Sequence, residues 1–369
     1  MKRFFYSLLI IMFAFVTKPL WEESVHEMIP ESVSDTFYSI KEFTTQIIDG
    51  DFSHDQLGEQ YLSLHPTIPD EEQEPVKKIA LSIPDEQVFS VGNVEIGDAK
   101  GDVEQRYGAA MRESENEYGL AWSTYHENYQ NFIMVAYDDG EIVRGLFTNQ
   151  DLLTSQFGLE IGDTRSLVHE TLGESEEFIH YDSFSYQINS EDEYDIYRID
   201  GNYVTIFYDL HESDRVTAIQ LIDAEIEMIK NDLYPPGSQA LKEGFEYQLF
   251  DLTNATRVYN GLSILEWEEN VRETARKHSA DMAENQFFSH TNLANQSLSD
   301  RMIEDGIRFR LAGENLAYGQ FNSIFAHQGL MNSAGHRENI LHDGFTKLGV
   351  GVAFNRDQHP FYTENFFTD

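Results

Sequence analysis

An internal repeat constrains the fold of this 369-residue chain more than any other feature of the sequence. The stretches VEIGDAKGDVEQRYG (94–108) and LEIGDTRSLVHETLG (159–173) align without a gap. Similar stretches in tandem indicate a repeated supersecondary unit. In each copy, a strand pattern precedes a short helical pattern that ends at a glycine, and several strand patterns follow. We therefore predict a duplicated module of two βαβββ units, at about 92–150 and 157–224.

Asp98 and Asp163 occupy the same place in the two copies, directly before the helical pattern. Aspartate is a favoured N-cap residue, because its carboxylate accepts hydrogen bonds from the free backbone N–H groups of the first turn. We therefore interpret both residues as helix caps rather than catalytic carboxylates. The repeat contains no cluster of residue types that indicates a reaction.

Two proline-rich breaks divide the chain. Four prolines fall between residues 66 and 84 among acidic residues, and YPPGS occupies 234–238. Such stretches are typical of linkers and turns. We predict an acidic N-terminal segment with a proline-rich linker at 18–88, the duplicated module at 89–232 and a further domain at 240–369.

The first residues bear on localisation. Lys2 and Arg3 precede an apolar run from Phe4 to Val16, which has the length of a signal-peptide core and is short for a membrane span. We predict that residues 1–17 are a signal peptide or a signal anchor. The protein is then extracellular or in the cell envelope, either secreted or membrane-anchored. A buried helix of the fold is the alternative.

Charge and cysteine content limit the partners and the chemistry. The net charge is −40, and residues 1–239 carry 47 acidic against 14 basic residues, whereas 240–369 carry 18 against 11. Such a surface repels phosphate backbones, which excludes nucleic acid as a general partner. It is either a solvated acidic surface or one that concentrates cations. The chain has no cysteine, which excludes disulfides, thiolate metal sites and a cysteine nucleophile.

Residues 240–369 have a different pattern. Helical periodicity runs through 246–261, 267–286, 297–306 and 322–333, and Gly261 ends the first of these helices. Apolar residues then alternate from Leu348 to Phe354, and 359–367 read as a strand that pairs back. Helices followed by an antiparallel sheet predict an α+β domain.

Five motifs occur in order in this domain: FFSHT (287–291), AGENLAYG (312–319), MNSAGHRENIL (331–341), FTKLGVGVAF (345–354) and FYTENF (361–366). Together they resemble the CAP superfamily, which includes the cysteine-rich secretory, antigen 5 and pathogenesis-related proteins, in its cysteine-free bacterial, SCP-like extracellular form. The repeat resembles the CAP-associated N-terminal domain. The resemblance implies a C-terminal α-β-α sandwich whose cleft holds two histidines and two glutamates.

Carried over by motif, the resemblance assigns His290, Glu314 and His336 to this cleft. The second glutamate does not carry over: Ser333 stands about where it is expected, and Leu330 replaces a tryptophan usual in bacterial relatives. Glu364 is the candidate replacement for the missing carboxylate. Asn315, Arg337 and Asn339 are interpreted as braces of the turns around the site.

Three uses of the cleft stay open. Two imidazoles and one carboxylate are a ligand set for Zn²⁺ or another divalent cation with an open position, so His290, Glu314 and His336 are candidate metal ligands. They are also candidate catalytic residues, because a Glu–His pair can act as a general acid and base near neutral pH. The third use is a structural hydrogen-bond network. His278 is interpreted as a core histidine and His327 as a possible substitute ligand.

Whether the protein is an enzyme stays open. The incomplete glutamate set favours an exported binding protein that takes a metal ion, a small or lipidic ligand, or a cell-envelope component through the cleft. The alternative is an extracellular, metal-assisted, peptidase-like hydrolase that uses His290, Glu314 and His336.

Overall fold

The computed structural model describes residues 76–181 and 184–369. The predicted signal segment at 1–17 and most of the acidic segment at 18–88 lie outside the described residues. The described chain is α+β, as predicted. None of its helices is both long and apolar enough to span a bilayer.

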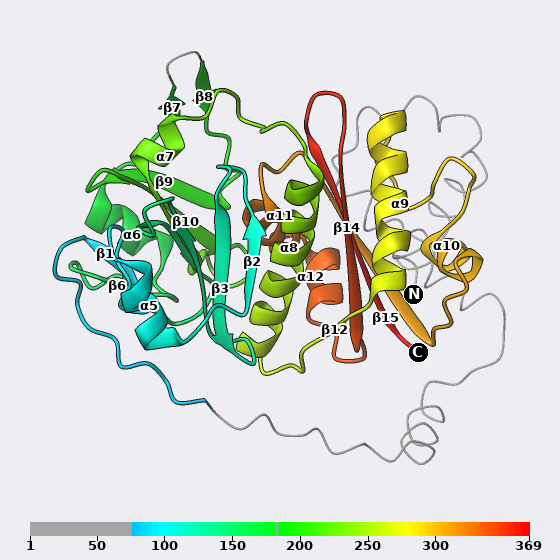
Figure 1. Cartoon of the computed structure of the whole chain (residues 1–369), viewed down its shortest axis with the longest axis horizontal. Coiled ribbons are helices and arrows are strands. Elements are labelled where there is room, and N and C mark those ends of the chain that lie inside the picture. Colours follow the sequence, from blue (N-terminus) through cyan, green and yellow to red (C-terminus); the bar gives the residue numbers. More distant parts are fainter. Residues whose placement is uncertain (1–75, 182–183) are drawn as a thin grey trace, which may run out of the picture. The chain divides into compact units, whose positions relative to one another are not determined.

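The N-terminal module is built on a seven-stranded antiparallel sheet in the order β2-β3-β4-β5-β11-β10-β9. Strands β2, β3, β9 and β10 of this sheet are labelled in Figure 1. The pairs β1–β6 and β7–β8 form two small separate sheets. A strand, a helix and then further strands follow in this order in both halves, which meet where β5 pairs with β11; the duplication itself stays a prediction. The elements are β1 (Phe89–Val91), α5 (Lys100–Tyr107), β2 (Arg112–Glu115), β3 (Ala121–Glu127), β4 (Gln130–Tyr137), β5 (Val143–Thr148), β6 (Leu153–Ser155), α6 (Arg165–Leu172), β7 (Phe178–His180), β8 (Ser185–Gln187), β9 (Tyr194–Ile199), β10 (Asn202–Asp209), β11 (Arg215–Asp223) and α7 (Ala224–Met228).

The helix-cap prediction for Asp98 and Asp163 is wrong by one residue. Asp98 Oδ2 accepts the backbone N–H of Glu95 at 3.0 Å, and Asp163 Oδ2 accepts that of Glu160 at 2.9 Å. Each carboxylate therefore closes the turn before its helix. The cap is the next residue, and in α6 it is Thr164, whose side chain accepts a hydrogen bond from the first turn. The predicted glycine ends are confirmed, because both helices end at a glycine with positive φ.

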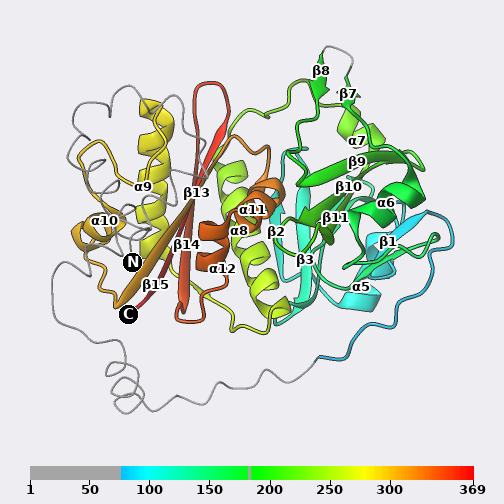
Figure 2. The same ribbon diagram turned by 180° about the vertical axis from the view of Figure 1, so that it is seen from behind.

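The C-terminal domain is a three-layered α-β-α sandwich. Its sheet has the order β12-β14-β15-β13; α9 and α10 cover one face, and α8, α11 and α12 cover the other (Figures 1 and 2). The four predicted helices and the final hairpin are confirmed, whereas strands β12 and β13 and helix α12 were not predicted. The elements are α8 (Gln239–Tyr259), β12 (Glu266–Trp267), α9 (Glu269–Asn285), α10 (Leu298–Glu304), β13 (Leu311–Tyr318), α11 (Ser323–Asn332), α12 (Ala334–Ile340), β14 (Lys347–Phe354) and β15 (Pro360–Thr368).

Helix α8 belongs to the packing of both domains. It contacts β14 on one side and β2 on the other, and one apolar cluster runs from Trp122 in the module to Val350 in the C-terminal sheet. Buried Asp251 on α8 accepts hydrogen bonds from Arg112 at 3.0 Å and from Tyr129 at 2.8 Å. The break at 234–238 therefore connects two domains that share a core.

Gly244 tests this shared packing. Alanine inside a helix is ordinarily more stable than glycine by about 1 kcal/mol. A Cβ at Gly244, however, would lie 2.1 Å from the backbone oxygen of Glu115 in β2. We expect Gly244→Ala to lower the free energy of unfolding by about 1–3 kcal/mol, measured by urea denaturation. The matched variant Gly329→Ala meets only ordinary contacts and should not destabilise. Equal stabilisation by both would contradict the packing of α8 on β2.

Candidate functional site

Glu314 on β13 is the centre of a three-residue cluster. Its side chain is 4% exposed; Oε1 lies 2.9 Å from Nδ1 of His290, and Oε2 pairs with the guanidinium of Arg301 on α10. Arg301 also donates to the backbone oxygen of His290 at 2.9 Å. Strand, helix and connecting loop are thus tied together at one carboxylate.

The cluster keeps Glu314 ionised although it is buried. Burial alone raises the pKa of this carboxyl, but the hydrogen bond from His290 and the positive charge of Arg301 outweigh it, so the pKa is lowered. His278 lies beneath the site, is 1% exposed, and bonds the backbone oxygen of Ser289 through Nε2 at 2.9 Å. Burial lowers its pKa. The interpretation of His278 as a core histidine is confirmed.

The contact with Glu314 selects one tautomer of His290. An ionised carboxylate only accepts hydrogen bonds, so the neutral imidazole must carry its hydrogen on Nδ1. Nε2 then keeps its lone pair. Because the His290 side chain is 46% exposed, this nitrogen belongs to an imidazole that an external ligand can reach. A carboxylate behind a histidine is the usual support of a ligating or basic imidazole.

The helix that carries His336 is held against the strand of Glu314. Asn315 donates to the backbone oxygen of His336 at 3.2 Å and accepts a hydrogen bond from Asn339 at 2.9 Å. Asn339 also donates to the backbone oxygen of Glu314 at 3.3 Å. The bracing role of both asparagines is confirmed, although GEN lies in a strand rather than a turn.

The motifs that carry His290 and Glu314 therefore meet through their side chains. The motif that carries His336 is joined to them through helix α12, which Asn315 and Asn339 hold on β13. Within 76–181 and 184–369, no group of three or more histidine, aspartate or glutamate side chains is arranged to hold a metal ion. Both oxygens of Glu314 already accept hydrogen bonds from His290 and Arg301. The assignment of His290, Glu314 and His336 to a metal stays a prediction.

Glu364 does not supply the missing carboxylate. It lies opposite Asn315 in the β13–β15 pairing, so its side chain is on the face of the sheet that Glu314 does not use. It is fully buried and accepts hydrogen bonds from Thr253 at 2.8 Å and from Asn315 at 3.1 Å. Burial raises its pKa to about 7. Alternation along β13, which the sequence did not indicate, separates the two glutamates.

Glu364 gives the fold a pH dependence. Its pKa is raised on folding, so its contribution to stability is fully present below the unfolded value, near 4.5, and is lost as the pH rises through about 7. The loss is on the order of 3 kcal/mol. We expect Glu364→Gln, which cannot ionise, to flatten the stability curve over this range in urea denaturation. An unchanged slope relative to wild type would contradict a neutral Glu364.

His327 is not close to the His290 cluster. It is fully buried on α11, and Nε2 lies 2.7 Å from the hydroxyl of Thr256 on α8. Burial lowers its pKa to about 3, so it is neutral. The structure therefore places it in the core between helices and not among the predicted ligands.

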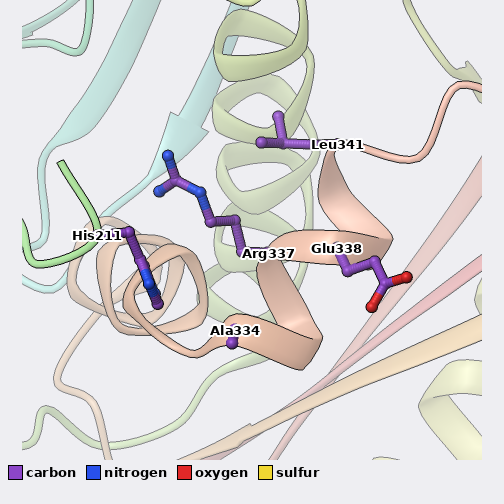
Figure 3. A pocket seen from close by; sticks show the side chains of 5 residues that line it. All are labelled: His211, Ala334, Arg337, Glu338 and Leu341. Atoms are coloured by element: carbon purple, nitrogen blue, oxygen red, sulfur yellow. The ribbon is translucent and has the colours of Figure 1, made fainter.

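The module reaches the helix of His336. Arg337 on α12 pairs with Asp209 of the module at 2.8 Å, besides bracing its own turn through the backbone oxygen of Met331. His211, after β10, lies 2.9 Å from the backbone oxygen of Asn332, which ends α11. An open cavity of about 310 Å³ lies beside these contacts. Figure 3 shows its lining residues, His211 from the module and Ala334, Arg337, Glu338 and Leu341 from α12 and its end.

Two functional contributors were missed from the sequence. Arg301 is the only basic residue of the helical stretch 297–306, and it stands next to apolar Met302. A basic residue on the apolar side of an acidic helix indicates a buried anion that pairs with it. Asp209 lies at the end of a module strand and gives no local sign of its distant partner.

Comparison with known proteins agrees with this architecture. The sequence model of the cysteine-rich secretory protein family matches residues 250–366, and the model described as CAP-associated N-terminal matches 96–233. The chain belongs to the CAP superfamily. The CAP domain contains the His290–Glu314–Arg301 cluster, and the associated domain supplies Asp209 and His211.

One of two Bacillus subtilis relatives aligns over a length that covers both domains. The chain is 28% identical over 291 residues to a Bacillus subtilis protein named uncharacterized membrane protein YlbC, an alignment that covers 73% of this chain and 82% of the relative. It is 40% identical over 122 residues to the B. subtilis uncharacterized protein YkwD, covering 33% of this chain and 46% of that protein.

Two solved structures share the fold. One is an extracellular protein with an SCP domain from Bacillus anthracis, with a TM-score of 0.66 and 24% identity, covering 80% of this chain and all of that one. The other is a cysteine-rich secretory protein from Staphylococcus aureus, with a TM-score of 0.58 and 16% identity, covering 78% of this chain and 98% of that one.

Proposed function

We propose that this CAP-domain protein is an exported binding protein that takes its ligand at Nε2 of His290, with His336 as a second contact, and that it does not catalyse a reaction. The observation that carries the proposal is the hydrogen bond between buried Glu314 and His290, which leaves Nε2 as the basic nitrogen of a half-exposed ring. A ligand with an electron-pair acceptor or a hydrogen-bond donor fits such a nitrogen.

A divalent transition-metal ion is the first ligand class to test. Neutral imidazole is its common protein ligand, and a carboxylate on the other ring nitrogen strengthens the imidazole as a donor. The residues that would hold it are His290 and His336, while Glu314 would orient His290 from behind. A bound cation would supply positive charge and open coordination positions for a polar ligand. Arg301 neutralises Glu314, so the carboxylate itself is a weak competitor for the ion.

Export is part of the proposal. It is supported by the basic and apolar start of the sequence, by the word extracellular in the name of the B. anthracis protein and by the word membrane in the name of the YlbC relative. Secretion and anchoring both agree with these observations. Fractionation of cells that produce the full chain distinguishes the two, and a protein found only in the cytoplasm would contradict both.

The test of binding is calorimetric titration of the full chain with Zn²⁺. We expect one equivalent to bind, and binding to weaken at least tenfold in His290→Ala and in His336→Ala. The matched control is His180→Ala, because His180 is an exposed histidine of the module. His327→Ala is unsuitable as a control because His327 lies in the core. No binding, or equal binding by all variants, would contradict the metal form of the proposal. Hydrolysis of a peptide and ester panel that disappears in His290→Ala would contradict its non-catalytic part.

A further inference from the structure

A second, smaller site lies in the module, where it packs on the CAP domain. The cavity has a volume of about 40 Å³, room for about three water molecules. Its wall is rich in aromatic rings from both domains, and the floor includes a buried glutamate. The polar and charged side chains of the lining include Glu117, Tyr118, Tyr181, Glu227 and Lys230.

Glu227 and Lys230 form a saturated unit on one side of this cavity. Lys230 Nζ lies 3.0 and 3.1 Å from the two oxygens of Glu227, and the hydroxyls of Tyr118 and Tyr181 also donate to this carboxylate. Nζ stands 4.3 Å from the centre of the Tyr118 ring. An ammonium group between a carboxylate and a tyrosine face is a cation–π arrangement. The protein therefore already holds one ammonium group here with its own lysine.

Glu117 is a second carboxylate in the wall of this cavity, and no ammonium group within 76–181 and 184–369 is hydrogen-bonded to it. It is 5% exposed; Oε1 accepts a hydrogen bond from Asn322, whereas Oε2 is buried and has no hydrogen-bond partner among the described residues. Glu117, Glu227 and Lys230 are the carboxylates and the ammonium among the described residues that line the cavity, so two glutamates share one positive charge in the wall when both are ionised. Burial raises the pKa of Glu117. An unpaired buried carboxylate is costly unless it is protonated or meets a cation.

We propose that this cavity is a binding site for a small primary ammonium group, which would donate to Oε2 of Glu117 and lie against the tyrosine rings. The aromatic wall favours an organic ammonium over a metal ion, because its faces attract a weakly hydrated cation and offer few oxygen ligands. The group could belong to a free amine or to the end of a lysine side chain, since both present the same ammonium.

The experiment uses the full chain and methylammonium chloride, with potassium chloride at equal ionic strength as the salt control. Binding is measured by saturation-transfer NMR of the methyl group and by the shift of the melting temperature. We expect methylammonium, and not potassium, to bind and stabilise the wild type, and Glu117→Gln to reduce its affinity at least tenfold. The matched variant Glu225→Gln, at an exposed glutamate on α7, should bind as wild type does.

Glu117→Gln keeps the size of the side chain and cannot ionise, so in the absence of amine it should melt at or above the wild-type temperature. Binding of a Gly-Lys-Gly tripeptide as well as methylammonium would support a peptide-borne ammonium, and binding of methylammonium alone would support a free amine. Equal effects of potassium and methylammonium, full affinity in Glu117→Gln, or a crystal grown with methylammonium that shows only ordered water in the cavity would overturn the proposal.

Discussion

Replacing Glu246 with alanine is expected to lower the free energy of unfolding by about 3–5 kcal/mol, enough to unfold much of the protein near 40 °C. Glu246 on α8 is fully buried. Arg272 donates to its Oε2 at 2.9 and 2.7 Å, and Arg276 donates to both oxygens at 2.6 and 2.7 Å. Oε1 also accepts the backbone N–H of Val352 at 3.1 Å. One carboxylate thus joins the helix layers on both faces of the sheet to the sheet itself.

Alanine at this position would remove the buried anion that two arginines share, and one of them, Arg272, is only 6% exposed. The matched control is Glu273→Ala. Glu273 pairs with the same Arg276 at 3.0 Å, but its side chain is 52% exposed, and an exposed pair contributes about 0–1 kcal/mol. Urea denaturation of both variants checks the difference. A loss below about 1 kcal/mol in Glu246→Ala would show that the three layers do not depend on this carboxylate.

The second large effect is expected at Glu314. Glu314→Ala should cost about 3–5 kcal/mol, because Arg301 is 6% exposed and would lose its counter-charge. Glu314→Gln keeps the volume and one acceptor, so we expect a smaller loss of about 1–3 kcal/mol. Both variants should weaken ligand binding at His290, because the ring loses the carboxylate that fixes its tautomer.

Denaturant unfolding and Zn²⁺ titration of the two variants separate stability from binding. Glu304→Ala, an exposed carboxylate on α10, is the control and should change stability by less than about 0.5 kcal/mol. If Glu314→Gln folds and binds as wild type does, the carboxylate neither supports Arg301 nor orients His290, and the account of the site is wrong.

Much of the fold could be predicted because the helices have clear periodicity and the final hairpin alternates from Leu348 onwards. Strand β13 was missed since its first half, with Gly313 and Glu314, has weak strand propensity. It forms nevertheless because it pairs with β15 along its whole length. Glycine fits at 313 because a Cβ there would lie 2.8 Å from the ring of Phe345 and 2.9 Å from Asn339. Tertiary packing decided what local propensity did not.

The site could be predicted only in part. The motifs supplied His290, Glu314 and His336, but the partner that keeps Glu314 ionised, Arg301, lies on a separate helix and is identified only by the folded contact. Glu364 illustrates the opposite error. Its motif predicted a position close to the site, but strand alternation places its side chain on the other face of the sheet. Register and face are properties of the assembled sheet, and the motifs did not encode them.

The most direct test of the account is ¹⁵N NMR of the His290 imidazole in the full chain, before and after addition of Zn²⁺. We predict that the ring carries a hydrogen on Nδ1, the nitrogen that faces Glu314, and that the Nε2 resonance shifts strongly when the ion is added. A ring that carries its hydrogen on Nε2, or an Nε2 resonance that Zn²⁺ leaves unchanged, would contradict the claim that Glu314 prepares His290 to bind a ligand.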